Sequence, residues 1–115
     1  MSDQDPLPKD IYGDEDKKRT ADQRKEADRL RKRHLSDVRK ILGMPEGRRV
    51  YWDMLKETGV FRNSFSTNAN QTAFNEGRRD VGLAILADVN KADSDAYPRM
   101  QREYWSERQK NQEAE

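Results

Sequence analysis

The sequence predicts an all-α protein in which three helices form a small core, with a long N-terminal helix and a C-terminal amphipathic helix. Three observations lead to this fold class. From residue 17 to residue 42 the chain has no proline or glycine and is rich in helix-forming residues. After Pro45, a favoured first residue of a helix, apolar residues share one helical face. From Phe74 to Val89, apolar residues recur every three or four positions, which is the period of an α-helix.

The composition shows that much of the chain lies outside a packed core. Of the 115 residues, 32% are hydrophobic and 39% are charged, whereas globular domains average about 45–50% apolar and about 25% charged residues. The chain is long enough for one domain. Its 23 basic and 22 acidic residues give a net charge of +1, so that the whole molecule exerts no strong attraction on nucleic acid.

Charge is distributed unevenly along this nearly neutral chain. Residues 1–16 carry one base and six acids, a net charge of −5, and residues 17–33 carry nine bases and three acids, a net charge of +6. Nearly all aliphatic side chains fall between residues 34 and 90. The predicted organisation is a disordered acidic arm (1–16), a basic projecting helix (17–33), a helical core domain (34–90) and a polar tail with a candidate docking helix (91–115).

The predicted core combines three helical segments with the loop that joins the last two. The apolar stripe of the first helix is confined to its second half, and Gly43 ends that helix. The second helix begins at Pro45 and Gly59 ends it; the third begins after Asn68 or Asn70, which are both good N-cap residues. We expect three phenylalanines to lie at or near the centre of the core: Phe61, Phe65 and Phe74.

After Pro98 the polar tail contains one more helical pattern. Tyr97, Met100, Tyr104 and Trp105 fall near one face of such a helix, and we take them as candidate partner-binding residues. The segment is too short and polar to be a stable helix by itself. It therefore either packs loosely on its own domain or becomes ordered on a partner.

The tetrapeptide Glu-Gly-Arg-Arg occurs twice, at residues 46–49 and 76–79. The residues that follow the two copies differ, so the copies do not form a repeat. Gly77 falls inside a helix, where glycine costs about 1 kcal/mol relative to alanine. A close approach of another helix at this position best explains why glycine is present, and Gly82 suggests a second close approach. The four arginines could clamp a phosphate, but residues 44–90 hold six bases and six acids, which favours ion pairs between the second and third helices.

Several function classes have little support in this sequence. There is no cysteine and only one histidine, His34, so that disulfides, thiolate chemistry and a zinc site are not expected. There is no glycine-rich phosphate loop, no apolar run of about 18 residues that could cross a membrane, and no signal peptide. We therefore expect a protein that is not an enzyme and that uses no cofactor and no metal.

The segment "PEGRRVYWDMLKETGVFRNSF", followed by "FNEGRRDVGLAIL", resembles a family of short structural-region proteins of tailed bacteriophages. A small product of the Bordetella tropism-switching podovirus typifies this family, and the resemblance covers about residues 37–89. The residues that carry the pattern are Arg48, Arg49, Phe61, Arg62, Phe65, Asn75, Glu76, Arg78 and Arg79.

The resemblance implies a non-enzymatic virion or assembly protein. It points to a minor head, portal or ejected internal component that is made in the bacterial host cytoplasm and resides in the virion. The partners it implies are other phage virion proteins or further copies of the same chain. The family assigns no chemical role to the residues of the pattern.

The alternative function is weak, non-specific DNA binding by the basic helix. Basic side chains supply affinity for phosphates without reading the sequence, and the helix offers no aromatic rings for stacking bases. A solvated helix would carry the same charges. The candidate DNA-contact residues are Lys17, Lys18, Arg19, Arg24, Lys25, Arg29, Arg31, Lys32 and Arg33.

Overall fold

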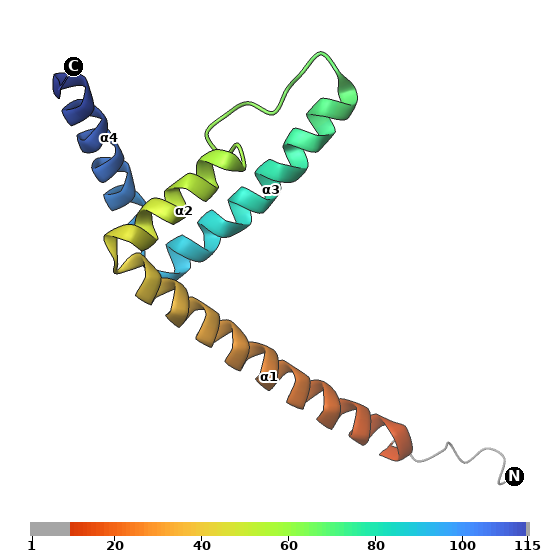
Figure 1. Ribbon diagram of the computed structural model, residues 1–115. Helices are drawn as coiled ribbons and strands as arrows, with labels where there is room; N and C mark the ends of the chain where they lie inside the picture. Colours follow the sequence, from red (N-terminus) through yellow and green to blue (C-terminus); the bar gives the residue numbers. More distant parts are fainter. Residues whose placement is uncertain (1–9, 115) are drawn as a thin grey trace, which may run out of the picture. The chain divides into compact units, whose positions relative to one another are not determined.

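The computed structural model describes the backbone of residues 10–114 and the side chains of residues 14–114. It contains four helices, and no strand occurs among these residues: α1 (Asp10–Leu42), α2 (Pro45–Glu57), α3 (Ala69–Ala92) and α4 (Ala96–Ala114) (Figure 1). The all-α fold class and the long first helix are therefore confirmed. The contacts divide the chain into two units, residues 1–34 and residues 35–115, and we describe them separately.

In its described part, the first unit is a single stretch of α1. Every side chain from residue 14 to residue 34 is exposed. Arg19 pairs with Asp16, and Arg29 pairs with Glu26, each at 2.6 Å. The hydrogen bond from Arg29 lowers the pKa of Glu26 below its usual value. These pairs join residues three apart on one helix, and such exposed pairs add little stability.

α1 begins at Asp10, earlier than predicted. Residues 10–16 of the expected disordered arm are therefore helical, and that part of the prediction is wrong; residues 1–9 of the arm lie outside the described residues. The reason is electrostatic, because acidic residues in the first turns of a helix interact favourably with its dipole. The acidic stretch 10–16 is thus continuous with the basic stretch 17–33 in one helix.

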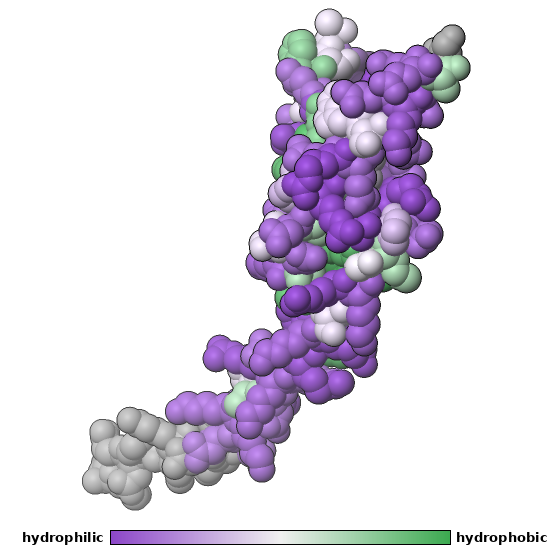
Figure 2. All heavy atoms as spheres, turned by 90° about the vertical axis from the view of Figure 1, so that its left-hand side faces the viewer, coloured by the Kyte–Doolittle hydropathy of each residue, from purple (hydrophilic) through white to green (hydrophobic). Residues whose placement is uncertain are grey.

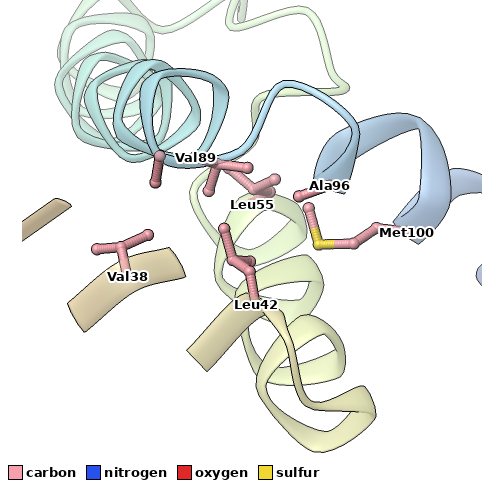
Figure 3. Close-up of a cluster of buried hydrophobic side chains, with 7 residues drawn as sticks. Val38, Leu42, Leu55, Val89, Ala96 and Met100 are labelled. Atoms are coloured by element: carbon pink, nitrogen blue, oxygen red, sulfur yellow. The ribbon is translucent and has the colours of Figure 1, made fainter. Parts of the chain in front are cut away.

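The core of the second unit lies where the end of α1 meets the other three helices (Figure 3). Its side chains are at most 8% exposed, and Leu55 and Val89 are completely buried. Around it pack partly buried residues that include Tyr51, whose pKa is raised by burial and then by the nearby Asp88 carboxylate. The core consists of Val38, Leu42, Leu55, Val89, Ala92, Ala96 and Met100.

α4 belongs to this core, which corrects the prediction of a three-helix core. Ala96 and Met100, in its first turns, are each 2% exposed. A tight turn between α3 and α4 directs these two residues toward the core. In this turn the backbone N–H of Asp95 donates to Asp93 Oδ1 at 3.0 Å, and the N–H of Ala96 donates to the Asp93 carbonyl at 3.1 Å. Met100 is therefore a core residue, and its prediction as a partner-binding residue is wrong.

The three phenylalanines do not lie at the centre of the core, contrary to the prediction. Phe61 is 43% exposed, Phe65 75% and Phe74 59%. The aliphatic side chains at the junction of the helices already fill the core, and the loop between α2 and α3 lies away from that junction (Figure 1). Phe65 and Phe74 therefore present most of their surface to solvent.

The predicted start and end of α2 depend on local chemistry and are confirmed, and Asn68 is the one of the two predicted caps that α3 uses. α4 begins at Ala96, earlier than predicted. α2 begins at Pro45 and is followed by Gly59, which has a φ of +78° that glycine adopts without strain. Asn68 caps α3: its side-chain oxygen accepts from the N–H of Asn70 at 2.9 Å and of Gln71 at 3.2 Å.

The glycines at which elements approach closely are Gly47 and Gly82. A Cβ atom on Gly82 would lie 2.1 Å from Thr58 Oγ1 and 2.4 Å from Val60 Cγ2, so that α3 touches the segment that follows α2. A Cβ atom on Gly47 would lie 1.9 Å from the carbonyl oxygen of Ile41. No such contact exists at Gly77, where a Cβ atom would meet no other described atom within 4 Å. The close approach predicted at Gly77 is therefore wrong, and the one suggested at Gly82 is confirmed.

Candidate partner-binding surfaces

The first Glu-Gly-Arg-Arg copy places Arg48 inside the second unit. Arg48 is 3% exposed. Its Nε donates to the two carboxylate oxygens of Glu103 at 2.9 and 3.2 Å, and its Nη1 donates to the carbonyl oxygen of Leu42 at 2.9 Å. One guanidinium thus connects α2 to the last residue of α1 and to α4. Because these internal acceptors occupy it, Arg48 has an architectural role.

The other arginines of the two copies lie at the surface or partly buried. Arg49 reaches Glu46 at only 3.9 Å, one turn away on the same helix. Arg78 donates to the backbone carbonyl of Glu57 and lies 3.9 Å from its carboxylate. The predicted ion pair between α2 and α3 therefore exists at Arg78. The better-buried pair, however, joins α2 to α4, which the sequence did not indicate.

Five aromatic rings from α2, the following loop and α4 form one aromatic cluster in the second unit. Its centre is Trp52, whose ring centroid lies 5.0 Å from that of Phe61 and 4.9 Å from that of Tyr104. Tyr97 is 6.2 Å from Trp52, and Trp105 is 5.7 Å from Tyr104, edge to face. Such arrangements add about 0.5–1.5 kcal/mol per pair beyond the buried area. Tyr97 and Tyr104 thus contact their own domain, while Trp105 remains 57% exposed.

A groove of about 970 Å³ runs between α2 and α4, which diverge in Figure 1. We call it the α2–α4 groove. Figure 2 views the molecule from the α4 side, where hydrophilic side chains dominate and hydrophobic ones form small, separate patches. The lining residues are Arg48, Arg49, Trp52, Asp53, Met100, Arg102, Glu103, Tyr104, Ser106, Glu107, Arg108, Lys110 and Asn111.

Trp52, which lines the groove, carries a polar atom that is buried without a partner. Trp52 Nε1 has no hydrogen-bond acceptor among the described residues. A buried donor in this condition costs about 1–3 kcal/mol. The free protein therefore tolerates an imperfect arrangement at the same ring that organises the aromatic cluster.

The loop between α2 and α3 presents Phe65 in a defined position. The N–H of Phe65 donates to Asn63 Oδ1 at 2.9 Å. On the other side, the N–H of Ser66 donates to Thr72 Oγ1 at 2.8 Å, and the Thr72 hydroxyl donates to the Ser66 carbonyl at 3.0 Å. The backbone of this highly exposed aromatic residue is therefore held from both sides.

Further residues of the predicted motif hold the same loop. Asn75 Nδ2 donates to the carbonyl of Ser64 at 3.2 Å, and Arg62 Nη2 donates to the carbonyl of Lys56 at 3.3 Å. These roles give a physical reason for two polar motif residues to which the sequence alone gave none. The structure brings them together beside the loop, where Arg62, Asn75 and Arg78 also line a small pocket of about 140 Å³.

Neither a cluster of candidate metal ligands nor a membrane-spanning helix occurs in the described part of the chain. Among residues 14–114 there is no group of three His, Asp or Glu side chains placed to hold a metal ion. None of the four helices is both long and apolar enough to span a bilayer.

Comparison with known proteins identifies the family. The family model described as "Bbp19-like phage protein" matches residues 38–102, which is more than half of the chain and includes α2, the Phe65 loop, α3 and the first turns of α4. Neither a curated protein nor a solved structure matches the chain. The match confirms the phage resemblance of the sequence and extends it beyond residue 89 into α4, and we conclude that the chain belongs to the Bbp19-like phage protein family.

Proposed function

We propose that the protein is a non-enzymatic component of the phage particle or of its assembly, and that it acts through protein–protein contacts. The observation that carries this proposal is Phe65, which is 75% exposed on a loop whose backbone is fixed by hydrogen bonds. Interfaces depend on a few large anchor side chains, and an anchor that is already ordered loses less entropy on binding. Membership of a phage family supplies the context.

The proposed role is that of a minor head, portal or ejected internal protein. It would be made in the bacterial host cytoplasm and reside in the virion, bound to other virion proteins or to further copies of itself. The absence of catalytic activity is part of the proposal and rests on the sequence, which has no cysteine and a single histidine. The buried arginine is committed to the fold, which agrees with this proposal.

Exchanging Phe65 for serine tests the role of the loop. We expect the free energy of unfolding to change by no more than about 0.5 kcal/mol, because the side chain is mostly exposed. The amount of protein in purified particles should fall severalfold. The measurements are urea denaturation and quantitative mass spectrometry of particles, prepared with and without their DNA, from phage complemented with each variant.

Thr67→Ala is the matched control, since Thr67 is an exposed residue of the same loop. It should leave both stability and incorporation unchanged. Normal incorporation of the Phe65→Ser protein would show that another surface makes the contact. Absence of the wild-type protein from particles and from their assembly intermediates would refute the proposed function itself.

The exposed basic stretch of α1 supports a second candidate function, weak binding to packaged DNA. All nine candidate DNA-contact residues are exposed, although Arg19 and Arg29 each pair with a carboxylate on the same helix. The acidic residues 10–16 cannot fold back over residues 17–33 of the same chain, because both belong to one continuous helix.

A salt series on duplex DNA tests this candidate. Neutralising six phosphates, the number matching the net charge of residues 17–33, predicts a slope of log affinity against log salt near about −5. Lys17→Gln combined with Lys18→Gln should make the slope shallower by about 2, whereas Lys110→Gln should not change it. Fluorescence anisotropy measures the binding, and no detectable binding at low salt would exclude this function.

A further inference from the structure

The α2–α4 groove has the form of a site for a third helix. One face of α2 and one face of α4 line it, and at its base the two helices contact each other through Trp52 and Tyr104 and through Arg48 and Glu103. Every side chain from residue 105 to residue 114 is exposed, although these residues remain helical. An isolated helix of this length is marginal in water, so an occupant that packs along the groove would stabilise it.

The lining of the groove favours an acidic occupant. It contains five bases and three acids, a net charge of +2. The pair of Arg48 with Glu103 at the base is satisfied internally, which leaves four bases and two acids along the open part. Of these bases, Arg102 and Lys110 make no ion pair with a described residue; Arg108 donates to the Tyr104 hydroxyl at 3.3 Å and covers the Trp105 ring.

The base of the groove favours an occupant with apolar residues at one end. Trp52 and Tyr104 line that part, while the far part of the α4 wall is polar.

We propose that the α2–α4 groove binds an acidic amphipathic helix of a partner phage protein. The apolar end of that helix packs against the aromatic cluster, and its carboxylates face Arg102, Arg108 and Lys110. In this helix-in-groove mode the apolar face of the partner is buried in the groove, and the charges around the groove determine which partner helix binds. The proposal deepens the proposed role in protein–protein contact and rests on it.

Single-stranded nucleic acid is the competing occupant, since the groove combines bases with aromatic rings. The lining disfavours it. Asp53, Glu103 and Glu107 would face the phosphates, and the Trp52 ring already contacts the rings of Phe61 and Tyr104, tilted by 32° to each, at centroid distances of 5.0 and 4.9 Å. These contacts compete with the stacking of bases, which bind on open aromatic faces in such proteins.

The two tryptophans of the chain provide a direct reporter. A Trp105→Phe variant of the full-length protein retains only Trp52, whose ring lies in the groove wall. We would titrate it, at physiological ionic strength, with a synthetic amphipathic helix as long as α4, 19 residues, with leucines on one face and glutamates on the other. The control peptide has lysine in place of every glutamate.

The acidic peptide should change the Trp52 fluorescence in a saturable way and the basic peptide should not. Reversing two groove charges, with Arg102→Glu and Lys110→Glu, should weaken binding about tenfold or more, because two attractive contacts become repulsive. The matched control carries Arg24→Glu and Lys25→Glu, an equal charge change on exposed residues of the first unit. It should bind the acidic peptide within about twofold of the parent protein.

Several results would overturn the proposal. The basic peptide could bind as tightly as the acidic one, or binding could be lost only in the Arg24/Lys25 control. Oligothymidine could give the Trp52 signal in place of the acidic peptide, or no probe could give a signal. Self-association of the protein that blocks the Trp52 signal would also overturn it, because the groove would then bind a second copy of the chain. None of these results affects particle incorporation, so the groove proposal and the proposed function fail separately.

Discussion

Gly47→Ala should lower the free energy of unfolding of the second unit by about 3 kcal/mol or more. The new Cβ atom would lie 1.9 Å from the carbonyl oxygen of Ile41 and 2.6 Å from its Cγ2 atom. The oxygen belongs to the backbone of the last turn of α1, so that relief requires α1 and α2 to separate at their junction. The core residue Leu42 is next to Ile41, and the displacement would reach the core directly.

Gly77→Ala is the matched substitution, since Gly77 occupies the same place in an identical tetrapeptide. Its Cβ atom would meet no atom within 4 Å other than those of its chain neighbours and of the adjacent backbone of its own helix, and alanine is the better helix former. Stability should rise by about 1 kcal/mol. Urea denaturation followed by circular dichroism measures both variants, and effects of the same sign and size would contradict the distinction between the two glycines.

This pair of glycines marks the boundary of what the sequence predicts. The sequence predicts Pro45 and Gly59 correctly, and Asn68 as one of two candidate caps, because helix starts, turns and caps depend on neighbouring residues. The role of a glycine depends on which element lies beside it. Because Gly47 and Gly77 have the same immediate neighbours in sequence, only tertiary structure distinguishes them.

The exposed phenylalanines show the same limit for hydrophobic periodicity. The apolar pattern from Phe74 to Val89 predicts one apolar face on α3, yet Val89 is completely buried and Val81 is 57% exposed. Periodicity identifies the face of a helix that is apolar but not how far along the helix its neighbours cover it. In the same way, periodicity places Met100 and Trp105 on one face, although Met100 lies in the core and Trp105 lies at the surface.

The candidate binding surfaces were predicted in part. The tail pattern selected Tyr104 and Trp105, which lie in or beside the aromatic cluster of the α2–α4 groove. Trp52 was not selected, because it adjoins the apolar face of α2 and nothing local relates it to a tail about fifty positions later. The Arg48–Glu103 pair was missed for the same reason, since its partners are 55 positions apart.

Arg48→Ala should lower the free energy of unfolding by about 3 kcal/mol. The substitution removes three hydrogen bonds and leaves the Leu42 carbonyl and part of the Glu103 carboxylate without a partner. This loss of stability is smaller than the largest losses seen when a fully buried ion pair is broken, because the Glu103 side chain is 38% exposed and water can reach it. Chemical denaturation in urea gives the value directly.

Arg49→Ala provides the control, since Arg49 is exposed and its only ion-pair partner among the described residues is Glu46, at 3.9 Å on the same helix. This substitution should change stability by no more than about 0.5 kcal/mol. A double-mutant cycle with Glu103→Ala isolates the pair. Because the second substitution removes the stranded carboxylate, the double variant should be more stable than the sum of the single losses predicts. An Arg48→Ala protein that unfolds like wild type, yet loses binding to a polyanion, would show that this arginine holds a phosphate and not the junction of three helices.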